Sequence, residues 1–209
     1  MGEPTAQWEL GDRYERGLGV RRNFKKALLC YKEAADGGDA RASHNLAIFY
    51  MKGKGVKKDL EKAKELLEQA AQGHVGEAYY QLSILQEKEG KRDEALESLI
   101  TAAKVDTPIA QYNLAILYLK KKIEPKGKAT YEHEATKWIT KAADLGLEEA
   151  QIKAGFHYDL GIGAKLNRNR ATTYFEEAAE QGNSTCKFIV AHRYCKGIGV
   201  EQQDISKAR

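Results

Sequence analysis

Apolar side chains return at every fourth position in short stretches along the whole chain. Ala6, Leu10 and Tyr14 form the first of these stretches. Residues four apart lie on one face of an α-helix, so the spacing predicts a helix with one buried face. The corresponding residues of the later stretches are Ala42, Leu46 and Tyr50; Ala78, Leu82 and Gln86; Ala110, Leu114 and Tyr118; Ala150, Ala154 and Tyr158; and Cys186, Val190 and Tyr194.

A second apolar stretch follows each of the first five and ends in a pair of alanines. The pairs are Ala34-Ala35, Ala70-Ala71, Ala102-Ala103, Ala142-Ala143 and Ala178-Ala179. The residues predicted to be buried in these second helices include Ala27, Tyr31 and Ala34; Ala63, Leu67 and Ala70; and Ala171, Phe175 and Ala178. Each complete repeat is therefore predicted to contain two helices.

The repeats begin at residues 6, 42, 78, 110, 150 and 186, so the steps are 36, 36, 32, 40 and 36. A period near 36 with two apolar stretches per unit is typical of stacked helical pairs, in which each pair covers its neighbour. We therefore expect an all-α solenoid of about five and a half helix-turn-helix repeats in a single array over 1–209. The expected repeats are 6–41, 42–77, 78–109, 110–149, 150–185 and an incomplete 186–209.

Glycine-rich loops join the two helices in four of the repeats. The first glycine of each loop is predicted to end its helix in the left-handed conformation. These glycines are Gly17, Gly53, Gly161 and Gly197, and the predicted caps of the helices that follow are Asn23, Asp59, Asn167 and Asp204. Glycine also stands inside two first helices, as Gly11 and Gly155. Because glycine there costs about 0.5–1 kcal/mol relative to alanine, we expect another helix backbone to pass close by.

Composition narrows the class of protein further. The chain is 42% apolar and 31% charged, and it has no apolar run long enough to cross a bilayer. No signal peptide is visible. A net charge of +4 is too small for a dedicated nucleic-acid binder. Three sparse cysteines, Cys30, Cys186 and Cys195, favour a reducing compartment, so we expect a cytoplasmic protein.

The sequence contains no pattern typical of an active site. Its five histidines include no pair four residues apart and no HExxH motif, and there is no CxxC motif. Serine never stands in a GxSxG elbow, and the loop glycines belong to no phosphate-binding motif. We expect no enzyme activity, no catalytic residue, no metal and no cofactor. The five lysines of Lys120–Lys128 form either a solvated loop or a contact for an acidic partner.

The recurring pattern A-x-x-x-L-G-x-x-Y-x-x-G-x-G-V, followed by a cap and a helix ending in A-A-x-x-G, resembles the Sel-one-like repeat, a relative of the tetratricopeptide repeat. The resemblance covers essentially the whole chain, although the third repeat lacks the glycine loop and the fourth replaces it with the lysine-rich loop. It implies a right-handed superhelix and a role as an adaptor or scaffold for protein–protein interaction. It implies no chemistry.

In this superfamily the first helices line the concave face, so residues beside the buried stripe would face a groove. The resulting candidate partner-binding residues are Trp8, His44, Asn45, Ile48, Tyr80, Tyr112, Asn113, Ile116 and Phe156. A contiguous apolar strip left in water is more often an interface than an accident. The two asparagines could both donate to and accept from an extended ligand backbone. The alternative is that tighter packing buries these side chains.

The leading hypothesis for function is an adaptor that holds a partner peptide or helix in the concave groove, without nucleic acid or membrane insertion. The alternative is a structural module of a larger protein or homo-oligomer that docks through its repeat ends. The sixth repeat is incomplete, because its second helix begins at Asp204 and the sequence ends at Arg209. Terminal repeats normally need a cap, so self-association through this C-terminal repeat is a further expectation.

Overall fold

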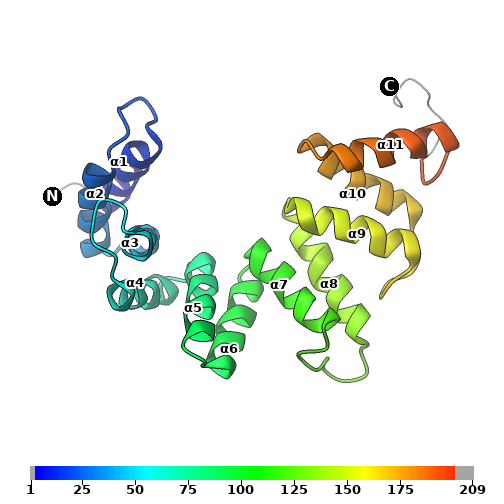
Figure 1. Cartoon of the computed structure of the whole chain (residues 1–209), viewed down its shortest axis with the longest axis horizontal. Helices are drawn as coiled ribbons and strands as arrows, with labels where there is room; N and C mark the ends of the chain where they lie inside the picture. Colours follow the sequence, from blue (N-terminus) through cyan, green and yellow to red (C-terminus); the bar gives the residue numbers. More distant parts are fainter. Residues whose placement is uncertain (1–2, 201–209) are drawn as a thin grey trace. The chain divides into compact units, whose positions relative to one another are not determined.

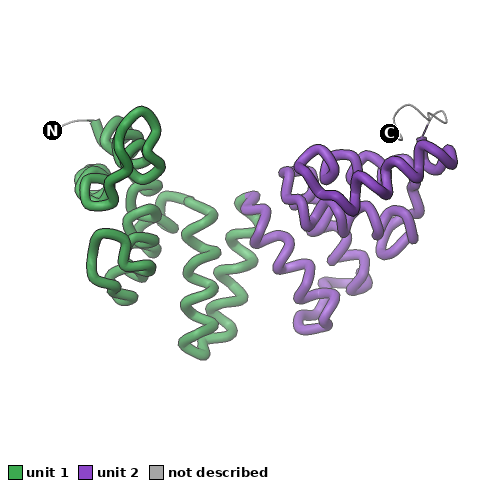
Figure 2. The backbone as a smooth tube through the Cα atoms, turned by 45° about the horizontal axis from the view of Figure 1, so that its top comes forward, with its two compact units in different colours: residues 1–105 green, residues 106–209 purple. Residues whose placement is uncertain are grey.

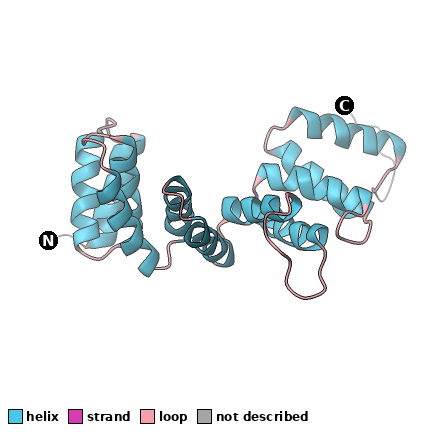
Figure 3. Cartoon of the chain, turned by 60° about the horizontal axis from the view of Figure 1, so that its bottom comes forward, coloured by secondary structure: helices cyan, strands magenta, loops and turns pink. Residues whose placement is uncertain are grey.

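The computed structural model describes residues 3–200, and within that range the chain consists of helices and loops without strands (Figures 1 and 3). The all-α helix-turn-helix prediction is confirmed. The helices are α1 (Pro4–Arg16), α2 (Phe24–Asp36), α3 (Ala40–Lys52), α4 (Leu60–Gln72), α5 (Gly76–Lys88), α6 (Arg92–Lys104), α7 (Pro108–Leu119), α8 (Tyr131–Asp144), α9 (Glu148–Leu160), α10 (Arg168–Glu180) and α11 (Ser184–Lys196). The second helix expected from Asp204 in the incomplete repeat 186–209 lies outside the described residues, whereas the first helix of that repeat is α11.

The chain divides into two compact units, which Figure 2 shows in green and purple. Unit 1 comprises Met1–Val105 and unit 2 comprises Asp106–Arg209. Within unit 1 the pairs α1–α2, α3–α4 and α5–α6 pack together, and α2 and α4 also pack against the next first helix. Within unit 2 the same arrangement joins α7–α8 and α9–α10, with α8 against α9 and α10 against α11. Each of α2, α4, α8 and α10 therefore lies between two first helices of its own unit.

The helix ends follow the signals in the sequence. Asn23, Asp59 and Asn167 each accept a hydrogen bond from the backbone N–H three residues on, at 3.1, 2.9 and 3.0 Å. These bonds satisfy donors that a helix start leaves unpaired. The first loop glycines end their helices in the left-handed conformation, with φ of 76° at Gly17 and 70° at Gly161. Both sets of predictions are confirmed for the described residues.

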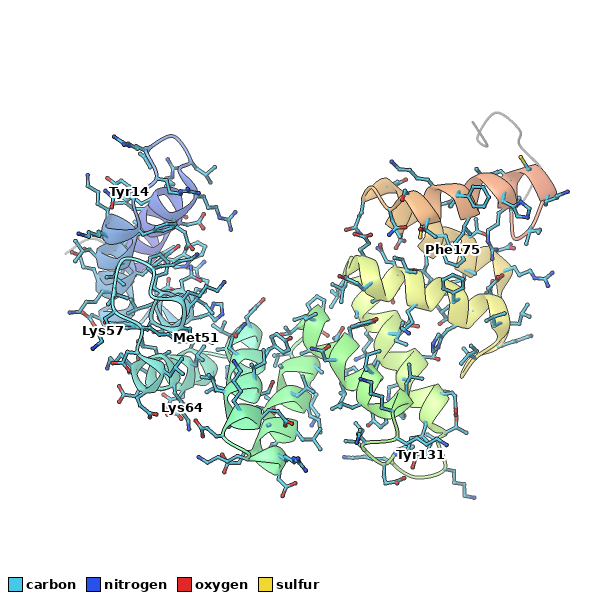
Figure 4. All side chains as sticks on the ribbon, in the orientation of Figure 1. Tyr14, Met51, Lys57, Lys64, Tyr131 and Phe175 are labelled. Atoms are coloured by element: carbon cyan, nitrogen blue, oxygen red, sulfur yellow. The ribbon has the colours of Figure 1, made fainter. Side chains whose placement is uncertain are left out.

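Aromatic residues of the second helices fill the space between repeats. In unit 1 the fully buried ring of Tyr31 meets Phe49 of the next repeat edge-to-face, with centroids 5.4 Å apart. In unit 2 Phe175 on α10, labelled in Figure 4, is also fully buried. The predicted buried residues of α2, α4 and α10 all lie in the core. One expectation fails, because Ala6 and Leu10 of α1 are exposed although their counterparts in α3 are buried.

The glycines inside the first helices make room for an aromatic ring. A Cβ at Gly11 would lie 2.7 Å from the Tyr31 ring, and one at Gly155 would lie 2.6 Å from the Phe175 ring. The expected close approach of another helix backbone is therefore wrong, since the neighbour is a side chain. The ring belongs to the second helix of the same repeat. The ring occupies the space that a side chain at the glycine position would fill. This packing offsets the poor helix propensity of glycine.

The second glycine of the loops has a role beyond the turn itself. Gly163 lies against the first turn of α8, where an added Cβ would overlap the carbonyl oxygen of Glu132. Gly199 meets the first turn of α10 at Arg168 in the same way, and a Cβ at Gly55 would lie 3.1 Å from the backbone of Phe24. The loop of one repeat thus packs directly on the second helix of the repeat before it.

Polar side chains also cross from one repeat to the next in unit 2. The Thr136 hydroxyl donates to the carbonyl oxygen of Ile162 at 2.8 Å, so Nδ1–H of His157 donates to that hydroxyl at 2.7 Å. One repeat later Arg193 takes the place of His157 and donates to the Thr172 hydroxyl at 3.1 Å. Arg193 is buried and also pairs with Asp159 at 2.6 Å. The hydroxyls of Thr136 and Thr172 and the side chains of His157 and Arg193 therefore have hydrogen-bond partners across the interface between repeats.

Acidification should lower the stability of unit 2, because His157 is protonated more easily in the unfolded chain than in the folded one. Burial, and then the charge of Lys153, lowers the pKa of His157 in the folded protein. In the unfolded chain the pKa of a histidine is about 6.5. Between these values the unfolded chain binds the proton first, so the free energy of unfolding decreases as the pH falls through the unfolded pKa. Urea unfolding of the wild type and of His157→Gln at pH 7.5 and pH 5.5 should give a smaller pH-dependent loss in the variant. Equal losses would contradict this role for His157.

Candidate partner-binding surface

Five of the predicted groove residues belong to unit 1. Trp8 lies on α1, His44, Asn45 and Ile48 lie on α3, and Tyr80 lies on α5. We call these five residues the unit 1 stripe. All are half-buried, and none belongs to the fully buried core. The alternative of complete burial is therefore not met, and each side chain keeps part of its surface in solvent.

Trp8 lies under an arginine of the next first helix. It packs against the unit 1 core, and the Arg41 guanidinium stands 4.2 Å from its ring centroid. Asp39 holds that guanidinium at 2.9 Å and caps the start of α3. Such a cation–π contact contributes about 0.5–1 kcal/mol at an exposed site. The indole Nε1 is buried and has no hydrogen-bond partner among the described residues.

His44 is held in its neutral form. Burial lowers its pKa, and the negative charge of Glu77 and a hydrogen bond with Asn45 only partly oppose the effect. Its Nε2 atom is buried and lacks a hydrogen-bond partner within the part of the chain that the structure describes. A buried polar atom without a partner costs about 1–3 kcal/mol. The unit 1 stripe therefore contains two buried nitrogen atoms, on Trp8 and His44, that lack hydrogen-bond partners among the described residues.

Asn45 already takes part in an internal network. Burial raises the pKa of Tyr31, as do the charge of Glu15 and the hydrogen bond to it, while a hydrogen bond from Asn45 lowers that pKa. The Tyr31 hydroxyl donates to Glu15 at 2.9 Å. The amide of Asn45 is thus engaged with the interior, and a ligand backbone would share it. An amide has two N–H groups and a carbonyl, so sharing is possible.

The remaining predicted residues belong to unit 2. Tyr112, Asn113 and Ile116 lie half-buried on α7, and Phe156 lies on α9. We call these four residues the unit 2 stripe. Burial, and then the charge of Glu149, raises the pKa of Tyr112. The Phe156 ring meets Phe175 edge-to-face at 5.1 Å and is 44% exposed.

The structure adds Phe188 on α11 to the candidates. Its side chain is 74% exposed, although phenylalanine is normally at least partly buried. Phe188 stands two residues after the first residue of its repeat, Cys186, as Trp8 and Tyr112 do after Ala6 and Ala110. The repeat position was therefore a usable signal in the sequence, but only the structure distinguishes its exposure from that of the half-buried members.

The lysine-rich loop between α7 and α8 is partly folded onto α8. Lys121 adopts a φ of 52° and places its ammonium 5.5 Å from the ring centroid of Tyr131. The Tyr131 hydroxyl donates to Glu124 at 2.7 Å, and Figure 4 labels Tyr131 at this loop. The loop lysines are exposed. One loop lysine, Lys121, thus lies against an aromatic ring. Contact of the loop with an acidic partner stays a prediction.

The described residues lack the features of two other kinds of site. Within 3–200, histidine, cysteine, aspartate and glutamate side chains form no group of three that could hold a metal ion. None of the described helices is long and apolar enough to cross a membrane. The half-buried and exposed aromatic positions therefore remain the features that the geometry singles out.

Comparison with known proteins agrees with the fold. The model of the Sel1 repeat matches residues 4–39, 40–74, 108–123, 127–147, 148–183 and 186–209. Protein sel-1 homolog 2 of Rattus norvegicus is 31% identical over 123 residues, which make up 58% of this chain and 18% of that relative. The chain thus spans less than a fifth of the length of this relative.

Solved structures are similar over nearly the whole chain. A Sel1 repeat protein from Oxalobacter formigenes has a TM-score of 0.78 at 26% identity, covering 99% of this chain and 84% of that chain. The immunity protein PA5088 from Pseudomonas aeruginosa has a TM-score of 0.66 at 22% identity, covering 93% of this chain and 71% of that one, and shares the fold. On the repeats matched over most of its length, this chain belongs to the Sel1 repeat family.

Proposed function

We propose that this protein is an adaptor that binds a peptide or helix of a protein partner along its first helices. Sel1 repeats generally mediate protein–protein interactions. The observation that carries the proposal is the exposure of large aromatic side chains beside the buried stripe, 44% for Phe156 and 74% for Phe188. Aromatic residues supply much of the binding energy in interfaces because they bury a large area with few rotatable bonds.

The two stripes favour an apolar ligand with a few polar contacts. Phe156 and Phe188 offer ring surface in unit 2, and Trp8 and His44 offer polar atoms that lack partners in unit 1. An extended peptide or an amphipathic helix carries both apolar side chains and backbone or side-chain acceptors. The lowered pKa of His44 suits an uncharged contact, since a negatively charged ligand group would favour its protonated form.

A second candidate function, docking of the chain through a repeat end, is favoured by one observation. Ala6 and Leu10 of α1 are exposed, although the corresponding Ala42 and Leu46 of α3 are buried. Such a module would join a larger assembly without holding a peptide. The two functions use different residues, so substitutions separate them.

Selection of displayed twelve-residue peptides on the immobilised protein tests the adaptor proposal. We expect the selected peptides to bind the wild type and to bind Phe156→Ser and Phe188→Ser at least tenfold more weakly. Phe188 is 74% exposed, so Phe188→Ser should leave thermal unfolding almost unchanged, whereas Phe156→Ser also removes the edge-to-face contact with Phe175 and should lower the unfolding temperature. Binding is therefore compared at a temperature at which circular dichroism shows both variants to be folded. Binding would be measured by fluorescence anisotropy with labelled peptides.

Leu160→Ser is the matched control, because Leu160 is also an exposed apolar residue of α9. It should not change peptide affinity. Selected peptides that bind both phenylalanine variants as tightly as the wild type, or that lose affinity only with Leu160→Ser, would refute the assignment. Failure to recover any specific peptide would also count against it.

A further inference from the structure

The first helix of unit 1, α1, exposes a face that is buried in other first helices. Leu10 is 38% exposed, whereas Leu46 at the same position of α3 is 4% exposed. Ala6 is exposed, whereas Ala42 of α3 and Ala150 of α9 are fully buried. In α3, α5, α9 and α11 the cover is the second helix of the preceding repeat, namely α2, α4, α8 and α10. The repeats themselves thus show which kind of element fits this face.

The loop after α1 repeats the same contrast. Gly55, Gly163 and Gly199 each pack on the first turn of the preceding second helix, but an added Cβ at Gly19 would meet nothing within 4 Å. Gly19 keeps the left-handed conformation of the others, with a φ of 72°. An open depression of about 410 Å3 lies here, lined by Trp8, Glu9, Asp12, Arg13, Leu18 and Gly19. The depression marks the place that a helix start occupies in the other loops.

The chemistry of the missing cover follows from Arg193, which stands in α11 where Arg13 stands in α1. Arg193 is buried against α10, where its guanidinium carbon lies 5.1 Å from the Phe175 ring centroid and its nitrogen atoms reach Thr172 and Asp159. Arg13 is exposed and makes no ion pair or side-chain hydrogen bond with any described residue. The α1 face therefore carries an arginine whose counterpart binds a hydroxyl, an aromatic ring and a carboxylate.

We propose that the α1 end face, formed by Ala6, Leu10, Arg13, Leu18 and Gly19, binds the second helix of a Sel1-type repeat of another polypeptide. That helix begins at Gly19 and runs along Ala6 and Leu10. It carries a hydroxyl residue followed three positions later by an aromatic residue, as α10 does with Thr172 and Phe175. A carboxylate from the same partner neutralises Arg13. Phe156 and Phe188 of unit 2, whose exposure carries the proposed peptide contact, do not belong to this face, although Trp8 of the unit 1 stripe lines the depression beside it.

A labelled peptide with the sequence of residues 165–183 tests this proposal, because it contains α10 with its cap Asn167. An isolated helix of this length is marginally stable, so a lactam bridge between residues introduced at the exposed positions 169 and 173 would hold it helical. Fluorescence anisotropy should show saturable binding to the wild-type protein. Leu10→Glu and Arg13→Glu should weaken that binding at least tenfold, and so should replacement of Thr172 by valine with Phe175 by alanine in the peptide.

Two control variants of the protein make the result specific. Leu29→Glu changes a leucine of α2 that is 59% exposed, and it should leave the affinity unchanged. Phe188→Ser removes the exposed ring of unit 2 and should also leave the affinity unchanged. No saturable binding, equal binding to Leu10→Glu and wild type, or a loss confined to Phe188→Ser would each overturn the proposal. The last outcome would place the peptide on the surface assigned to partner binding instead.

Discussion

Replacing Gly163 with alanine should destabilise unit 2 by about 2–5 kcal/mol. The left-handed conformation at a φ of 63° costs a non-glycine residue about 1–2 kcal/mol. The new Cβ would also overlap the carbonyl oxygen of Glu132, which belongs to a helix backbone and cannot rotate away. Overpacking of this kind typically costs about 1–3 kcal/mol. Urea unfolding followed by circular dichroism would measure the loss.

Gly19→Ala is the matched control for this prediction. Gly19 occupies the same loop position with a φ of 72°, but an added Cβ there would contact nothing within 4 Å. Only the conformational cost of about 1–2 kcal/mol should remain. Equal destabilisation by the two substitutions would show that the loop glycines serve the turn alone, and that the packing of loop on preceding helix contributes nothing.

Truncation of Phe175 should have an effect of similar size. Phe175→Ala removes a fully buried ring between α9 and α11 and should cost about 3–5 kcal/mol. The loss should fall on unit 2, because Phe175 packs against residues of that unit. Circular dichroism during urea unfolding would again report the change in stability.

The Phe175 ring should also determine whether Gly155→Ala stabilises or destabilises unit 2. In the wild type, Gly155→Ala places a Cβ 2.6 Å from the Phe175 ring, and overpacking opposes the gain in helix propensity. In the Phe175→Ala background the ring is absent, so Gly155→Ala should stabilise the helix by about 1 kcal/mol. A double-mutant cycle measures this coupling. Strictly additive effects would contradict the packing of the ring against Gly155.

Much of the fold could be predicted because the signals are local and repeated. Alanine and leucine four residues apart define the buried faces, and Asn23 and Asp59 cap the helices that follow them. Both signals depend on backbone geometry that a sequence pattern specifies directly. The left-handed glycines at the helix ends follow for the same reason.

The neighbours of these residues could not be predicted equally well. The spacing around Gly155 indicates a close contact, but it does not tell whether a backbone or the ring of Phe175 makes it. The contact of His157 with Thr136 joins residues 21 positions apart and has no periodic signature. Exposure of Leu10 depends on which helix lies beside α1, and a repeat pattern treats every copy alike.

In the candidate site, too, the sequence predicted helical positions but not the contacts and exposure of the side chains. Helical position identified Trp8, His44 and Tyr80 as neighbours of the buried stripe, and all three are half-buried. Asn45 stands one residue after His44, and its contact with Tyr31 depends on the packing of α3 against α2. Phe188 lay outside the predicted set, although it is the more exposed of the two phenylalanines on the first helices of unit 2. Side-chain exposure is a property of three-dimensional packing, so the pattern alone could not rank these residues.

Hydroxyl-radical footprinting with and without a saturating selected peptide tests the central claim most directly. The method reports the solvent exposure of individual side chains, so it distinguishes the first helices from the second helices and the loops. Binding along the first helices predicts strong protection of Phe156 and Phe188, with no change at Leu29 of α2 or Tyr131 at the start of α8. Protection of Leu29 or Tyr131 while both phenylalanines remain as reactive as in the free protein would contradict the claim.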